Sequence, residues 1–146
     1  MSKSSPGLEW PGGGTRTKSS PFLPKAHILL VEDEFLIRLL LCETLVEEGF
    51  AVTEASDGAE AVVALESNDG FDLLLTDVHM PGHFDGIAVA QHARARRPGL
   101  PVIFATGRPE VLQAFGPLGE REVVLSKPFS PSEAVRVVER LLNTPN

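Results

Sequence analysis

The chain of 146 residues contains no tyrosine, one tryptophan and one cysteine, Cys42. One cysteine excludes an internal disulfide, and because Cys42 lies in an apolar helical stretch we expect a buried, inert thiol. No stretch comes near the roughly 18 consecutive apolar residues of a membrane span. The first residues also lack the apolar run of a secretion signal. These absences predict a globular protein of the cytoplasm.

Basic residues are scarce outside the first 25 positions. Residues 1–25 carry four Lys or Arg against one acid, whereas the rest of the chain carries nine against 19 acids. Because Lys and Arg supply most of the affinity for phosphate backbones, the acidic body argues against nucleic-acid binding. Residues 1–25 are rich in Ser, Gly and Pro without periodicity, which predicts a flexible extension. Trp10, Phe22 and Leu23 could form a docking motif there, although an unstructured leader is the simpler interpretation.

From Ala26 onward, short apolar runs alternate with stretches of helical periodicity. The apolar runs predict strands at 27–31, 51–55, 72–76, 102–105 and 123–125. The periodic stretches predict helices at 35–48, 58–67, 87–97 and 131–142. Gly116, Pro117 and Gly119 interrupt the pattern between Pro109 and Glu122, so a helix there should be short and poorly formed.

Alternation of strands and helices has a topological consequence. Such strands pair in parallel through right-handed crossovers, with helices on both faces of the sheet. Residues 26–144 are therefore predicted to form one α/β domain, a flavodoxin-like, doubly wound, five-stranded parallel sheet with about five helices. Folds of this kind bind their ligands at the carboxyl ends of the strands.

Chemically capable residues stand where these strands end. The first strand is followed by Glu32 and Asp33, the third by Asp77, the fourth by Thr106 and the fifth by Lys127. Because the carboxyl ends of parallel strands share one edge, three carboxylates, a hydroxyl and an ammonium should face each other there. Each residue alone is weak evidence, but the set in this order on this topology is a strong signal.

Three neighbouring carboxylates repel one another unless a cation neutralises them, and hard oxygen ligands favour Mg²⁺. We expect Asp33 and Asp77 to bind the ion directly, with the backbone carbonyl of His79 as a further ligand. Glu32 would act through water. Asp77 would also be the nucleophile, because a carboxylate that attacks phosphorus forms an aspartyl phosphate.

Phosphoryl transfer requires neutralisation of the charge on the transferring group more than covalent help. Mg²⁺ would cover one of its oxygens, the Lys127 ammonium a second and the Thr106 hydroxyl a third. The residues at this predicted edge therefore match the needs of a phosphoacceptor.

The chain resembles the receiver domains of response regulators in two-component systems. The motifs that carry the resemblance are Leu29–Glu34 (LLVEDE), Leu74–Pro81 (LLTDVHMP), Asp85-Gly86, Thr106 and Lys127–Phe129 (KPF). The resemblance covers residues 26–143. The resemblance implies Mg²⁺-dependent phosphorylation of Asp77 by a sensor histidine kinase or a histidine phosphotransfer protein.

Some positions depart from the common receiver pattern. Val124 occupies the place of an aromatic residue that in many receivers swings inward with the Thr hydroxyl, and Glu32 replaces a frequent Asp. Phe104–Gly107 (FATG) resembles the FAT-GUY subgroup, which lacks that aromatic, although Arg108-Pro109 does not continue its motif. The loop 82–84 is one residue longer than usual. We therefore expect output by an order change in the segment around 108–121.

Other functions fit the residues of this chain less well. A phosphatase of the haloacid dehalogenase type would need an acid two residues after Asp77, where His79 stands, and room for a cap domain. A degenerate receiver that only binds proteins is disfavoured because Asp33, Asp77, Thr106 and Lys127 are all present. A dinucleotide site is disfavoured because no GxGxxG follows the first strand.

Histidines suggest a transition-metal site only weakly. The four are His27, His79, His83 and His92, and they form no HxH pair; His79 and His83 have HxxxH spacing, but they fall in the loop after Asp77 and not on a predicted helix. We expect His79 and His83 to line the entrance of the site instead.

Because no output domain follows Leu142, we expect a single-domain regulator that is no enzyme and signals through protein contacts to an unknown target. It should be a monomer or a weak, phosphorylation-dependent dimer, without nucleic-acid or membrane partners.

Overall fold

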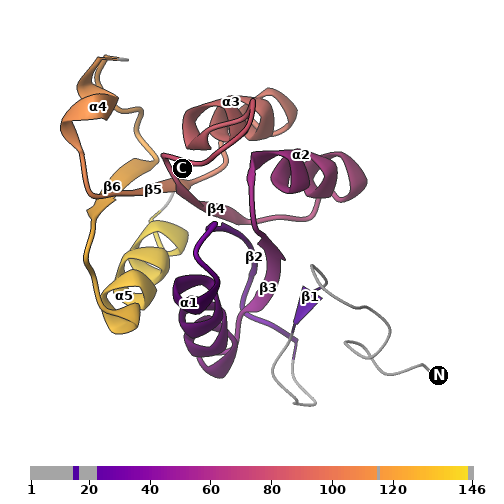
Figure 1. Cartoon of the computed structure of the whole chain (residues 1–146). Coiled ribbons are helices and arrows are strands. Elements are labelled where there is room, and N and C mark those ends of the chain that lie inside the picture. Colours follow the sequence, from indigo (N-terminus) through magenta and orange to yellow (C-terminus); the bar gives the residue numbers. More distant parts are fainter. Residues whose placement is uncertain (1–14, 17–22, 115, 145–146) are drawn as a thin grey trace.

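The computed structural model describes residues 15–16, 23–114 and 116–144 of the chain (Figure 1). Trp10 and Phe22 of the proposed docking motif lie outside these residues, whereas Leu23 is described and is almost fully exposed. Within the described part of the chain, no helix has the length and apolarity needed to cross a membrane.

Five parallel strands form the body of the sheet. They are β2 (His27–Val31), β3 (Ala51–Ala55), β4 (Leu73–Asp77), β5 (Val102–Thr106) and β6 (Glu122–Ser126). Their spatial order is β3-β2-β4-β5-β6, so the direction of winding reverses between β2 and β4. That reversal defines the flavodoxin-like, doubly wound fold and confirms the prediction.

A sixth strand, β1 (Thr15–Arg16), lies outside the predicted sheet. It pairs antiparallel with β3, with Thr15 opposite Thr53 and Arg16 opposite Val52. Both residues fall within residues 1–25, for which the sequence predicts a flexible extension, and the pairing departs from that expectation at these two positions. The physical reason is that β3 ends the parallel sheet and presents backbone N–H and C=O groups to any nearby segment. Two residues are too few for a periodic signal.

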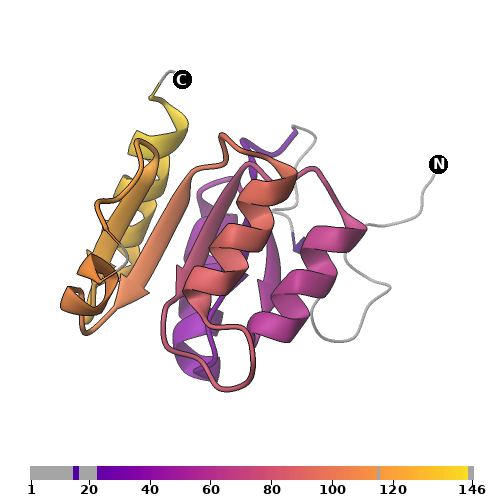
Figure 2. The ribbon, with the colours of Figure 1, turned by 90° about the horizontal axis from the view of Figure 1, so that it is seen from above.

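Helices cover both faces of the sheet (Figure 1). The helices α1 (Phe35–Glu47) and α5 (Pro131–Leu142) lie on one face. On the other face, α2 (Gly58–Ser67) and α3 (Gly86–Arg96) run side by side, as Figure 2 shows. The remaining helix, α4 (Glu110–Gln113), has four residues and confirms the prediction of a short helix between Pro109 and Glu122.

Two apolar layers enclose the sheet, one on each face. All five residues of β4 are buried, and Leu73 and Leu75 belong to the layer under α1 and α5. Leu74 points to the opposite layer, under α2 and α3. This double burial explains why the strand appears in the sequence as an unbroken apolar run and not as an alternating one.

Local signals set the ends of the helices. Ser130 and Glu133 form the predicted capping box at the start of α5, with Pro131 in its first turn. Gly49 ends α1 with a φ of 103°, a left-handed conformation that favours glycine. Strand ends are less well signalled, since β4 and β5 each extend one residue further than predicted and so include Asp77 and Thr106.

Candidate functional site

The strand ends bring the predicted site residues to one edge of the sheet. Asp77 and Thr106 are the last residues of β4 and β5, and Glu32 and Lys127 directly follow β2 and β6. The register holds these ends level, because Asp77 stands opposite Ala105 on β5. The structure therefore brings the predicted residues together.

Three carboxylates form a compact cluster at this edge. Glu32, Asp33 and Asp77 each contribute an oxygen, and these oxygens lie within 4.8 Å of one another. Glu32 and Asp77 are 2% and 6% exposed, while Asp33 faces solvent. An all-carboxylate donor set that is open on one side suits a hard divalent cation that keeps several waters. The residues present thus fit Mg²⁺, and the carbonyl of His79 as a further ligand stays a prediction.

Lys127 is the counterion of the cluster. Its Nζ lies 3.1 Å from Oε1 of Glu32 and 3.3 Å from Oδ1 of Asp77. Burial disfavours the ammonium form, but Glu32 and Asp77 outweigh this effect and raise the pKa of Lys127. The side chain is therefore charged at neutral pH and bridges two of the three acids. The sequence indicated its place at this edge but not the contact with Glu32.

The pKa values of two of the acids, Glu32 and Asp77, are raised. Burial and then the Glu32 carboxylate raise the pKa of Asp77 to about 7, against the opposing effect of Lys127. Burial also raises the pKa of Glu32, although the Glu34 N–H and Lys127 stabilise its charged form. At a pH below about 7 the metal-free cluster therefore retains a proton on Asp77, which a bound cation would displace.

Thr106 is buried, with 1% of its surface exposed. Its hydroxyl oxygen accepts a hydrogen bond of 2.9 Å from the backbone N–H of Arg108. Its carbonyl accepts a second bond, 2.8 Å long, from the Lys127 N–H. Thr106 thus joins the end of β5 to the segment before α4 and to the start of the β6–α5 connection.

A glycine contact that the sequence did not reveal packs α3 against the site. A Cβ atom on Gly86 would overlap the carbonyl oxygen of Asp77, and the Gly86 N–H donates to Val78 O at 2.8 Å. Asp85 begins α3 by accepting a hydrogen bond from the Ala88 N–H. The Asp85-Gly86 pair was visible as a motif, but the close approach that requires glycine is a tertiary contact.

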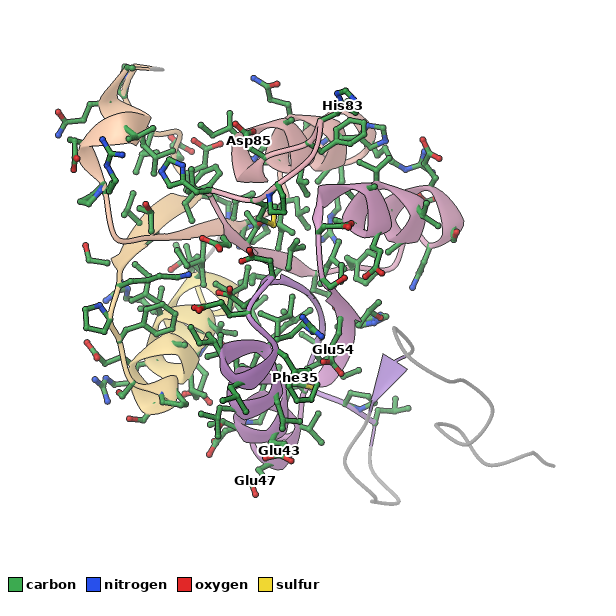
Figure 3. All side chains as sticks on the ribbon, in the orientation of Figure 1. Phe35, Glu43, Glu47, Glu54, His83 and Asp85 are labelled. Atoms are coloured by element: carbon green, nitrogen blue, oxygen red, sulfur yellow. The ribbon has the colours of Figure 1, made fainter. Side chains whose placement is uncertain are left out.

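The described histidines lie outside the carboxylate cluster, and a place for His79 and His83 at the entrance of the site stays a prediction. His79 and His83 are exposed on the loop before α3, and Figure 3 shows His83 and Asp85 beside that helix. His27 contacts Thr53 Oγ1 through Nε2 at 2.7 Å, and burial lowers its pKa despite Asp72. Among the described residues, the one group able to hold a metal ion contains carboxylates and no histidine.

Comparison with known proteins identifies the family to which this sequence and fold are similar. The family model of the response regulator receiver domain matches residues 28–139. The receiver protein CpdR of Brucella abortus is 38% identical over 117 residues, which cover 80% of this chain and 96% of CpdR. Other curated relatives are longer, and the chain spans 48% of one and 26% of another.

Solved structures share the fold. A response regulator receiver protein from Sinorhizobium medicae superimposes with a TM-score of 0.75 at 33% identity, covering 82% of this chain and 95% of that one. The receiver domain of the sensor histidine kinase PA1611 from Pseudomonas aeruginosa has a TM-score of 0.69 at 30% identity, with coverages of 82% and 98%. That receiver contains a magnesium ion coordinated in its active-site cleft.

Proposed function

The chain belongs to the response-regulator receiver-domain family, and we propose that it accepts a phosphoryl group from a phosphohistidine onto Asp77. The observation that carries the proposal is the environment of Asp77. It is a nearly buried strand-end carboxylate with two further acids and the Lys127 ammonium around it. This is the arrangement that a phosphoryl acceptor requires, because it combines a cation site with a nucleophile.

The residues at the edge have separable roles in the transfer. An oxygen of Asp77 forms the new P–O bond while the P–N bond to histidine breaks, and the pair of electrons from that bond stays on the imidazole. Mg²⁺ supplies neutralisation of phosphoryl charge when bound. Lys127 already lies 3.3 Å from Asp77 and would pair with a phosphoryl oxygen. The buried Thr106 hydroxyl would donate to another.

Receiver domains exchange phosphoryl groups with histidine kinases or histidine phosphotransfer proteins, and we propose one of these as the donor here. The protein would act as a phosphoacceptor in the cytoplasm and not as an enzyme with a turnover of its own. Its signal would leave through contact with a downstream protein, from a monomer or a weak, phosphorylation-dependent dimer. Neither a haloacid-dehalogenase-type phosphatase nor a degenerate receiver has an observation in its favour, because His79 replaces the required acid and the cluster is complete.

Phosphorylation can be tested without knowing the kinase. Acetyl phosphate and Mg²⁺ should add one phosphoryl group to the chain, measured by intact mass, and Asp77→Asn should abolish the addition. Asp69→Asn serves as the matched control, because Asp69 is an exposed carboxylate paired with Arg96 far from the edge. Labelling that persists in Asp77→Asn would show that the acceptor is another residue.

A further inference from the structure

Arg38, in the first turns of α1, is held from three sides. Its Nη1 donates a hydrogen bond of 2.8 Å to the backbone carbonyl of Glu32. Its Nε lies 3.4 Å from Oε1 of Glu54 on β3, and its Cζ lies 5.7 Å from the centre of the Phe35 ring. Phe35 and Glu54, both labelled in Figure 3, belong to α1 and β3, so Arg38 contacts residues of two elements. The Arg38 side chain is consequently only 15% exposed.

The Glu32 carbonyl needs such a donor. Glu32 is buried, and a buried backbone carbonyl without a partner costs about 1–3 kcal/mol. Arg38 therefore links the turn between β2 and α1 to the neighbouring strand β3 through Glu54.

We propose that Arg38 is a positioning residue for the cation site, acting through the Glu32 carbonyl to orient the peptide group that leads into Asp33. This inference rests on the proposed function, because it concerns the same cation. Rotation of the Glu32–Asp33 peptide would move both carboxylates relative to Asp77, which is fixed at the end of β4. A guanidinium that donates to a carbonyl and is ion-paired with a carboxylate on another strand resists such rotation, since its donors have a fixed planar geometry.

If Arg38 acted only through its charge, its removal would change the Mg²⁺ affinity in the opposite direction. A positive charge near the cluster repels a divalent cation, so its removal would tighten Mg²⁺ binding. Loss of a positioning group instead weakens binding, and groups that orient metal ligands typically contribute about tenfold to a hundredfold in affinity. The direction of the change therefore separates the two roles.

The experiment is a Mg²⁺ titration of the full chain, followed by backbone amide NMR shifts at constant ionic strength. Arg38→Met should raise the Kd about tenfold. Arg38→Lys keeps the charge but loses the fork of donors, and should weaken binding to a smaller extent. The matched control is Arg94→Met, because Arg94 likewise contacts a carbonyl, Leu100 O at 3.1 Å, and a carboxylate, Glu122 at 3.5 Å, away from the cluster. Its Kd should equal that of the wild type.

Each result decides the question. A Kd that is unchanged or lower in Arg38→Met overturns the positioning role while leaving the proposed function intact. Absence of saturable Mg²⁺ binding in the wild type would overturn both. If Arg38→Met does not fold, Arg38→Lys decides alone, because its charge is that of the wild type and any loss of affinity then comes from geometry.

Discussion

At the carboxyl ends of β2, β4 and β6, charged groups crowd together: Glu32 and Asp77 are buried, and Lys127 contacts both of them from another strand end. The segment from Arg108 to Arg121 shows the reverse. Among residues 108–114 and 116–121, which the structure describes there, Leu112 alone is buried. A cavity of about 470 Å³ lies between this segment and α3, lined by Ile87, Phe104 and Leu118 among others.

The contrast separates the place where phosphorylation is proposed to occur from the place that can respond to it. Close packing at the acidic edge holds carboxylates near one another. Their mutual repulsion raises the free energy of the metal-free protein, and a bound cation or a phosphoryl group would alter that repulsion. The segment with α4 has few contacts to break and opens at low free-energy cost. Thr106 connects the two, because its hydroxyl accepts the Arg108 N–H.

The largest effect should come from disturbing the packing at the edge. Gly86→Ala places a methyl group against the Asp77 carbonyl and should lower the free energy of unfolding by about 3 kcal/mol. Chemical denaturation measures the loss. Gly99→Ala is the control, because no atom lies within 4 Å of its added Cβ, and it should change stability by less than about 0.5 kcal/mol. Equal losses in both variants would mean that close packing does not distinguish this edge.

A second effect concerns pH. The native state retains a proton on Asp77 up to a pKa of about 7, whereas an ordinary aspartate releases it near 3.8. Between these values the native state binds more protons than the unfolded chain, so the stability of the metal-free protein falls as pH rises. Asp77→Asn should remove much of this slope, on the order of 2 kcal/mol between pH 5 and 8. Thermal melts in a chelator provide the measurement, with Asp69→Asn as the unaffected control.

A smaller effect follows from the third carboxylate. Asp33→Ala removes one of three like charges and should stabilise the metal-free protein by roughly 1 kcal/mol at pH 8. The same variant should lose the stabilisation that Mg²⁺ gives to the wild type. Melting curves with and without Mg²⁺ show both changes. A metal-free Asp33→Ala that melts below the wild type would contradict the account of stored repulsion.

Most of the fold could be predicted from the sequence, because the signals are local. The apolar run at Leu73–Leu75 and the capping box at Ser130 each depend on a few neighbouring residues. The meeting of Asp77, Thr106 and Lys127 at one edge followed from strand order, since parallel strands share their carboxyl ends.

What the sequence could not show depends on tertiary contacts. The strand β1 forms because β3 offers an open edge, and two residues carry no period. The contact between Lys127 and Glu32 joins residues 95 positions apart. Arg38 has the sequence environment of an ordinary helix residue, and its role is visible only when the Glu32 carbonyl and Glu54 are seen beside it.

The smallest change in free energy is expected in the segment from Arg108 to Arg121, where the described residues have few buried contacts. A beryllofluoride mimic of the phosphoryl group should draw the Thr106 hydroxyl toward Asp77 and weaken its bond to the Arg108 N–H. Because few buried contacts hold the following segment, that local change should shift its balance between ordered and open states. Amide hydrogen exchange with and without the mimic should therefore change most between Arg108 and Arg121. The control is Val124→Phe, which introduces an aromatic residue on β6 and should alter phosphorylation little, because the expected response does not use a ring at that position. Slow exchange in this segment that the mimic leaves unchanged would place the response elsewhere, with α5 as the next candidate, and would remove the link that Thr106 is proposed to make between the two regions.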